Sequence, residues 1–116
     1  MKSIEIISIP VTDQQRAKAF YLQLGFEIVV ETTFGQNQWI QMRLPGNEVT
    51  FTLVNWFEKM PAGTIQGLVI RTPDLQKEIE TLTANGITVG KIDQTPWGKF
   101  ATVKDPDGNA LSLHQK

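Results

Sequence analysis

The feature that most constrains this chain is an internal repeat at a spacing of 61 residues. Asp13 and Asp74 begin two similar helix patterns, and Gly25 and Gly86 end them. Glycine is favoured at such ends because it adopts the left-handed backbone conformation at no steric cost. Since half of a 116-residue chain is too short for a stable core of its own, the two halves are predicted to fold together. Two further pairs at the same spacing are Trp39 with Phe100 and Pro45 with Pro106.

Each half is predicted to hold one strand, one helix and three more strands. In the first helix, Ala17, Phe20, Tyr21 and Leu24 form one apolar stripe, and Thr12 or Asp13 can cap its first turn. This order predicts an α+β fold, in which two βαβββ modules form curved mixed sheets around a cleft. We expect a single domain over 1–116, with module 1 at about 1–56, a joint at about 57–63 and module 2 at about 64–116. The predicted elements are strands at 2–11, 26–33, 38–44, 48–54, 65–71, 87–92, 99–104 and 110–114, with helices at 13–24 and 74–85.

Composition excludes several functional classes. Eleven Lys and Arg residues against twelve Asp and Glu give a net charge of -1, so a nucleic-acid partner is not expected. Cysteine is absent, which excludes disulfides and thiolate chemistry, and a single histidine excludes any site that needs two imidazoles from one chain. No apolar run is long enough for a membrane span, and the N-terminus lacks a secretory leader pattern. We therefore expect a cytoplasmic protein with no membrane partner.

Alternation along the strands predicts which side chains face a cleft. Leu111 and Leu113 belong on the helix side of the last strand, so Ser112 and His114 point the other way. A face of small, apolar and hydroxyl side chains is typical of a small-molecule site. By the same alternation the remaining residues expected on the cleft side are Ile6, Thr50, Thr52, Val69 and Arg71.

The sequence resembles the vicinal oxygen chelate superfamily, which includes glyoxalase I, extradiol dioxygenases and bleomycin-resistance proteins. The resemblance covers essentially the whole chain, and is carried by IPVTDQQRAKAFYLQLGFE near the start and TPWGKFATVKDPDGNALSL near the end. It implies the glyoxalase/bleomycin resistance/dioxygenase fold. It also implies a homodimer, because single-domain members usually complete their clefts across two chains.

The metal enzymes of this superfamily take one ligand from each of the first, fourth, fifth and eighth strands. Carried over by position, these ligands fall on Ile6, on Thr50 or Thr52, on Gly67 and on Ser112. None is a carboxylate or an imidazole, and neutral hydroxyls are poor ligands for a divalent ion. We therefore expect no metal and no cofactor, and none of the metal-dependent chemistry of the superfamily.

The candidate acid–base groups are His114 and Glu48. His114 is either a general base at the cleft rim or a solvated residue near a frayed terminus, and Glu48 is either catalytic or a solvated carboxylate at a turn. Arg71 can bind an anionic ligand group or form an ion pair with Asp74.

Aromatic residues are stronger evidence for a ligand-binding site than these charged and acid–base residues. Trp97 lies in a polar connection, TPWGK, where stacking on a planar ligand suits it better than core packing. Phe34 and Trp39 flank a loop and are expected to cover the cleft, while Trp56 can serve the core or a dimer interface.

Together these features predict metal-independent binding of an apolar or aromatic, antibiotic-like molecule in the cleft. Trp97 would stack on it, Ile6 and Val69 would give apolar contacts, and hydrogen bonds would come from Thr50, Thr52 and Ser112. The first alternative is a metal-free lyase or isomerase of the same superfamily. The second is a regulatory or assembly module with an empty cleft.

Overall fold

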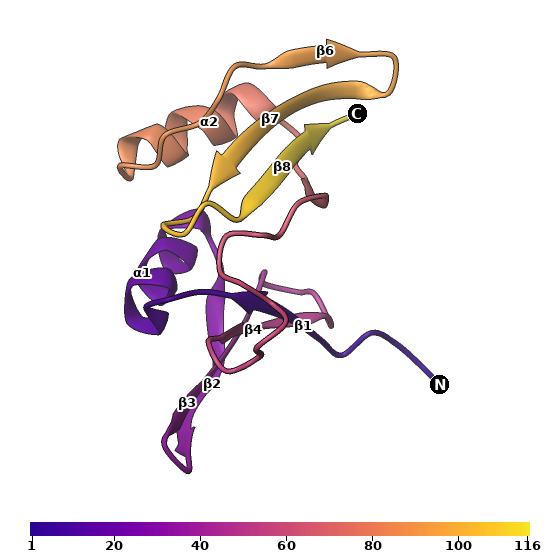
Figure 1. Cartoon of the computed structure of the whole chain (residues 1–116). Helices are drawn as coiled ribbons and strands as arrows, with labels where there is room; N and C mark the ends of the chain where they lie inside the picture. Colours follow the sequence, from indigo (N-terminus) through magenta and orange to yellow (C-terminus); the bar gives the residue numbers. More distant parts are fainter.

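The computed structural model describes residues 1–116 and has the predicted order of elements, with two four-stranded mixed sheets (Figure 1). One sheet has the strand order β1-β4-β3-β2 and the other the order β5-β8-β7-β6. The α+β class and the repeated βαβββ module are confirmed. The elements are β1 (Ile6–Pro10), α1 (Gln14–Leu24), β2 (Glu27–Phe34), β3 (Asn37–Arg43), β4 (Thr50–Val54), β5 (Leu68–Arg71), α2 (Leu75–Ala84), β6 (Asp93–Thr95), β7 (Gly98–Lys104) and β8 (Ala110–Gln115).

The two modules pair their strands in the same way. β1 runs parallel to β4, with Ile7 opposite Phe51, and β5 runs parallel to β8, with Leu68 opposite Leu111. All other strand pairs are antiparallel. β1 and β5 are therefore edge strands in equivalent positions.

Three predicted strands differ from the observed ones by three residues or more at one end. β1 and β5 are shorter than the predicted 2–11 and 65–71, and at the start of β5 Gly67 has φ +83°, outside the strand region. In the predicted strand 87–92, Val89 forms only an isolated bridge to Val103, and regular pairing with β7 begins at β6.

Both helices begin at the aspartates of the repeat. Asp13 accepts a hydrogen bond from the backbone N–H of Arg16, and Asp74 accepts one from that of Lys77. The choice between Thr12 and Asp13 is thereby settled in favour of Asp13. Gly25 ends α1 with φ +114°, as predicted. Neither helix has the length and hydropathy needed to cross a membrane.

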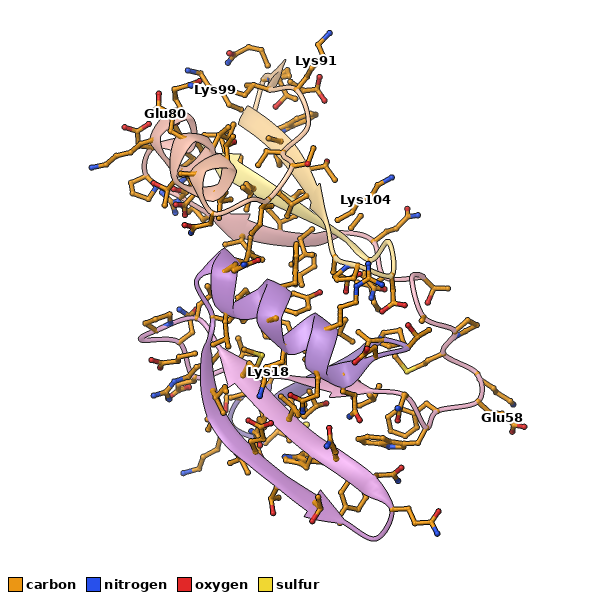
Figure 2. All side chains as sticks on the ribbon, turned by 90° about the vertical axis from the view of Figure 1, so that its left-hand side faces the viewer. Lys18, Glu58, Glu80, Lys91, Lys99 and Lys104 are labelled. Atoms are coloured by element: carbon orange, nitrogen blue, oxygen red, sulfur yellow. The ribbon has the colours of Figure 1, made fainter.

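One hydrophobic core joins the two modules. It comprises 17 buried residues from both, including Tyr21 and Leu24 of α1, Leu75 and Leu82 around α2, and Leu111 of β8. Charged side chains such as Glu58, Glu80 and Lys91 project outward from the surface (Figure 2). Burial of apolar side chains from both modules in this shared core favours their association.

A buried hydrogen-bond network also ties the modules together where the β7–β8 turn meets α1 (Figure 1). Tyr21 Oη donates to Asp105 Oδ2 at 2.8 Å, and Asn109 Nδ2 donates to the Pro10 carbonyl and to Asp105 Oδ2, both at 2.8 Å. Burial, reinforced by the neighbouring Asp105 carboxylate, raises the pKa of Tyr21 far above its ordinary value. The phenol therefore stays a hydrogen-bond donor.

Candidate functional site

The predicted cleft residues fall on the two sheets in separate groups. We call the side of the β1–β4 sheet opposite α1 the first-sheet face, and the side of the β5–β8 sheet opposite α2 the second-sheet face. The first carries Ile6, Thr50, Thr52, Trp39 and Phe34. The second carries Val69, Arg71, Ser112 and His114, with Trp97 in the turn between β6 and β7.

The hydroxyl groups on the first-sheet face are already bonded within the chain. Trp39 Nε1 donates to Gln41 Oε1 at 3.0 Å, and Gln41 Nε2 donates to Thr50 Oγ1 at 2.9 Å. Thr50 Oγ1 in turn donates to the Glu5 carbonyl at 2.7 Å. This series of hydrogen bonds orients the Trp39 ring, and it occupies the hydroxyl proton of Thr50.

Thr52 is equally committed, because its hydroxyl lies 3.3 Å from that of Ser8 and its side chain is only 1% exposed. Gln41 was missed by the sequence reasoning. It lies two positions from Trp39 on the same strand, so alternation could have placed it on this face, although not its hydrogen bonds.

Four aromatic rings line one end of the first-sheet face. Trp39 and Trp56 are stacked with ring centroids 6.4 Å apart, and Phe34 meets both edge-on at 5.8 and 5.3 Å. Phe57 packs on Trp56 at 6.0 Å. Phe34 and Phe57 are each nearly half exposed, so the cluster offers aromatic surface to a partner molecule.

The second-sheet face carries a separate aromatic platform. The His114 ring stacks on Phe100 with centroids 4.3 Å apart and planes at 13°. His114 Nε2 lies 3.0 Å from the Trp97 carbonyl. His114 is therefore half-buried within β8, and the interpretation as a solvated residue of a frayed terminus is wrong.

The Trp97 side chain is 76% exposed although its backbone is held firmly. Its N–H donates to Thr95 Oγ1 at 3.2 Å, and the next residue, Gly98, has φ +130°. A Cβ atom at Gly98 would collide with the Gln115 carbonyl and come within 2.9 Å of His114 Nε2. Gly98 thus allows the close turn that presents Trp97 beside His114.

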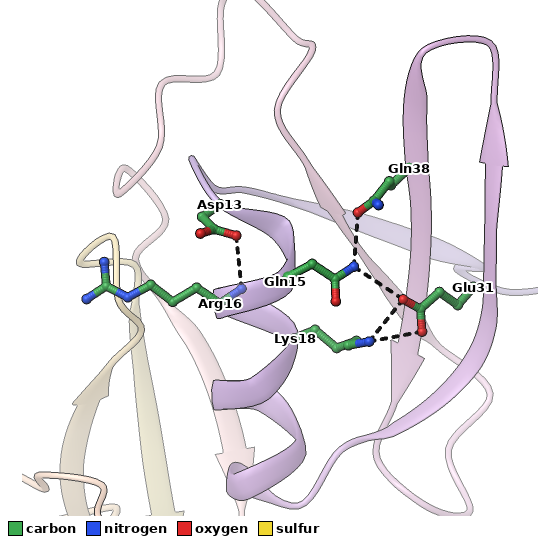
Figure 3. Close-up of polar contacts among 6 residues, drawn as sticks. All are labelled: Asp13, Gln15, Arg16, Lys18, Glu31 and Gln38. Carbon is green, nitrogen blue, oxygen red and sulfur yellow. Dashed lines mark hydrogen bonds and ion pairs between the residues drawn. The ribbon is translucent and has the colours of Figure 1, made fainter.

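Arg71 has no acidic partner in this chain. The two ion pairs are Lys18–Glu31 and Arg43–Glu27, and Asp74 is used as the α2 cap (Figure 3 shows Lys18 and Glu31). The predicted alternative of an Arg71–Asp74 pair is therefore wrong. Glu48, the other catalytic candidate, is exposed in the β3–β4 turn and forms no hydrogen bond. Nothing links its carboxylate to His114.

Hydrogen bonds favour the ionised form of the Glu31 carboxyl group. Lys18 Nζ lies 3.0 and 3.2 Å from its two oxygens, and Gln15 also donates to it (Figure 3). These bonds, that from Lys18 first, lower the pKa of Glu31.

No cavity of the single chain joins the two groups of predicted residues. A cavity of about 550 Å³ lies between α1 and the end of β7, where it is lined by Arg16, Phe20 and Lys104. A second one of about 390 Å³ lies between the edge strands β1 and β5 and includes Val69 and Arg71, but none of the predicted first-sheet residues. The cleft expected from the sequence is not enclosed within one chain, because the modules meet through the shared core.

Comparison with known proteins identifies the family. The family model described as Glyoxalase/Bleomycin resistance protein/Dioxygenase superfamily matches residues 3–113. The chain belongs to this superfamily. YetH of Bacillus subtilis, an uncharacterised protein, is 31% identical over 121 residues, covering 99% of each chain.

Two solved structures from Streptomyces sp. CB03234 are also similar. TnmS3, an antibiotic binding protein, is 35% identical with a TM-score of 0.93, and the match covers 99% of this chain and 96% of that one. A glyoxalase/bleomycin resistance protein is 37% identical with a TM-score of 0.86, covering 97% and 100%. The superfamily resemblance inferred from the sequence is confirmed.

The residues present do not fit the metal centre of the superfamily's enzymes. At the carried-over ligand positions, Ile6 and Gly67 have no donor atom, and Ser112 is a neutral hydroxyl. The hydroxyls of Thr50 and Thr52 are bonded to Glu5 and Ser8. No three His, Cys, Asp or Glu side chains gather closely enough to hold an ion.

Proposed function

We propose that this protein binds a small, largely apolar or aromatic, antibiotic-like molecule without a metal ion, and sequesters it. The observation that carries the proposal is Trp97, a large flat ring that is 76% exposed on a turn fixed by Gly98 and His114. Because the backbone of this turn is already held, only the ring of Trp97 has to be ordered when it stacks on a ligand.

The superfamily relationship supports binding as the activity. TnmS3 is an antibiotic binding protein that matches nearly the whole chain at 35% identity. The carried-over metal positions hold hydrocarbon, backbone and hydroxyl groups, so contact with the ligand would replace coordination.

The two faces make different contacts with the ligand. On the second-sheet face, Trp97 stacks on the ligand, Val69 gives apolar contact, and Ser112 offers a hydroxyl. On the first-sheet face, the aromatic cluster and Ile6 give apolar contact, while Thr50 and Thr52 stiffen the surface through their internal hydrogen bonds. Each aromatic contact adds about 0.5–1.5 kcal/mol beyond area burial.

A homodimer completes the site in this proposal. In one chain the two faces share no cavity, whereas a second copy can place its second-sheet face opposite the first-sheet face of its partner. Exposed aromatic surface at Phe34 and Phe57 supports such an association. Light scattering during size-exclusion chromatography should give twice the 13.0 kDa chain mass, and a monomer would contradict this part.

The binding claim is tested by tryptophan fluorescence with a panel of planar aromatic antibiotics. Trp97→Ala should weaken the best hit about tenfold, which corresponds to roughly 1.4 kcal/mol, and Trp97→Phe should restore most of the affinity. Trp97→Ala with unchanged affinity would remove the stacking role.

The absence of a metal requirement is tested separately. The protein is incubated with excess nickel, zinc, manganese or iron and then desalted, and elemental analysis should find less than one ion in ten chains, a rough bound set by the missing ligands. One tightly held ion per chain would refute metal independence while leaving ligand binding intact.

A further inference from the structure

The repeat makes the two junctions between the modules directly comparable. Because Ile7 pairs with Phe51 and Leu68 with Leu111, two steps back along β4 and β8 make Val49 the counterpart of Asn109. The pairs Gln41–Thr52 and Thr102–Ser112 likewise make Leu44 the counterpart of Asp105. At the 61-residue spacing, Leu82 matches Tyr21 and Arg71 matches Pro10.

The first junction is closed by polar groups. Asn109 bonds the Pro10 carbonyl, and Asp105 binds both Asn109 and Tyr21. In the second junction the counterparts of these three side chains are Val49, Leu44 and Leu82, none of which can form a hydrogen bond. Nothing therefore ties the β3–β4 turn to β5 in the same way.

The second junction is instead hollow. A cavity of about 390 Å³ lies there, walled by Leu44 and Val49 from the β3–β4 segment, Ile7 and Phe51 from β1 and β4, and Leu68 and Ile70 from β5. This volume lies within the range of small-molecule pockets, about 300–1,000 Å³, and its lining is predominantly apolar, as in such pockets.

One charged group lines this cavity. Arg71, at the end of β5, is among its lining residues; its side chain is exposed and forms no ion pair, and the only other polar lining residue is Asn47. A guanidinium without an acidic partner, beside an apolar wall, is complementary to a molecule that has a hydrocarbon body and one carboxylate.

We propose that the junction cavity is a second binding site, which takes a small amphipathic carboxylic acid with its carboxylate at Arg71. The cavity shares Val69 with the proposed antibiotic site but is otherwise distinct from it, because neither Trp97 nor any ring of the first-sheet aromatic cluster lines the cavity. The ligand class also differs, since an aliphatic chain can fill this cavity without any aromatic stacking partner.

Titration calorimetry with octanoate and its neutral match octanamide tests the proposal. The wild-type protein should bind octanoate about tenfold more tightly than octanamide, because a carboxylate strengthens the hydrogen bonds from Arg71. Arg71→Gln should abolish this preference. Val49→Phe, which fills the cavity, should weaken both ligands. Arg16→Gln, which removes a cation from the other cavity, should change neither.

Two results would contradict the proposal of a second binding site. One is no octanoate binding, or equal affinity for octanoate in wild type and Arg71→Gln. The other is a Val49→Phe variant that retains octanoate affinity but changes the oligomeric state, which would assign the cavity to contact with a second copy. Unfolding midpoints of all variants show whether they are folded. Trp97→Ala should leave octanoate binding unchanged, so the outcome is separate from that of the antibiotic site.

Discussion

Asn109 carries the polar junction between the modules, and its replacement by alanine gives a sharp test of how the fold is held. The side chain is fully buried and makes three hydrogen bonds: Nδ2 donates to the Pro10 carbonyl and to Asp105 at 2.8 Å, and Oδ1 accepts from the Ile65 N–H at 3.0 Å. Water cannot replace these bonds unless the junction opens. Asn109→Ala therefore leaves the buried Pro10 carbonyl and the half-buried Ile65 amide without these partners.

The expected loss in free energy of unfolding follows from the hydrogen bonds that Asn109→Ala breaks. An unsatisfied buried backbone group costs about 1–3 kcal/mol, which applies to the Pro10 carbonyl, and the half-buried Ile65 amide adds about 1 kcal/mol. The lost bond to the Asp105 carboxylate adds about 1.5 kcal/mol. Asn109→Ala should lower the free energy of unfolding by roughly 3.5–5.5 kcal/mol, against a total of about 5–15 kcal/mol for a domain.

Urea unfolding followed by circular dichroism measures this cost. Tyr21→Phe, which removes one bond to Asp105, should cost less, about 1.5–3 kcal/mol. Asn47→Ala is the matched control in the other turn. Its amide is exposed and has one long contact of 3.5 Å, so the cost should stay under about 0.5 kcal/mol. A loss below about 1 kcal/mol for Asn109→Ala would refute the reasoning.

The remaining predictions concern the turn at Trp97, the aromatic wall and one titrating group. Gly98→Ala should destabilise the fold by about 2 kcal/mol and lower ligand affinity, because its Cβ collides with the Gln115 carbonyl; unchanged melting would contradict this. Gln41→Leu frees the indole N–H of Trp39, so the tryptophan emission should shift, and an identical spectrum would argue against that hydrogen bond. Lys18→Met should raise the pKa of Glu31 toward its ordinary value in an NMR titration. Because the folded pKa lies below the unfolded one, the stability this bond supplies is present above the unfolded pKa. It is lost as the pH falls through the folded pKa, and so the wild-type advantage should vanish in acid.

Features encoded locally were predictable from the sequence. Asp13 and Gly25 bound α1 because a side-chain cap and a left-handed residue satisfy the ends of a helix using only neighbouring atoms. Alternation correctly placed Leu111 and Leu113 in the core. The 61-residue spacing then extended the same order to the second half.

The same local rules gave wrong results where a strand needed a partner. The segment 87–92 has strand-like composition, yet it makes one isolated bridge, since pairing depends on where β7 runs. Arg71 and Asp74 are close in sequence, but the N–H groups at the start of α2 use the carboxylate as a cap.

What the tertiary structure alone decided is how distant residues share their hydrogen bonds and their space. The commitment of Thr50 to Gln41 and Glu5, and of Asn109 to a carbonyl 99 positions earlier, has no trace in local periodicity. The repeat predicts two equal junctions, whereas packing closes one with polar groups and leaves the other hollow beside Arg71. A sequence pattern fixes which side of a strand a residue faces, but only the meeting of two folded modules fixes what it touches there.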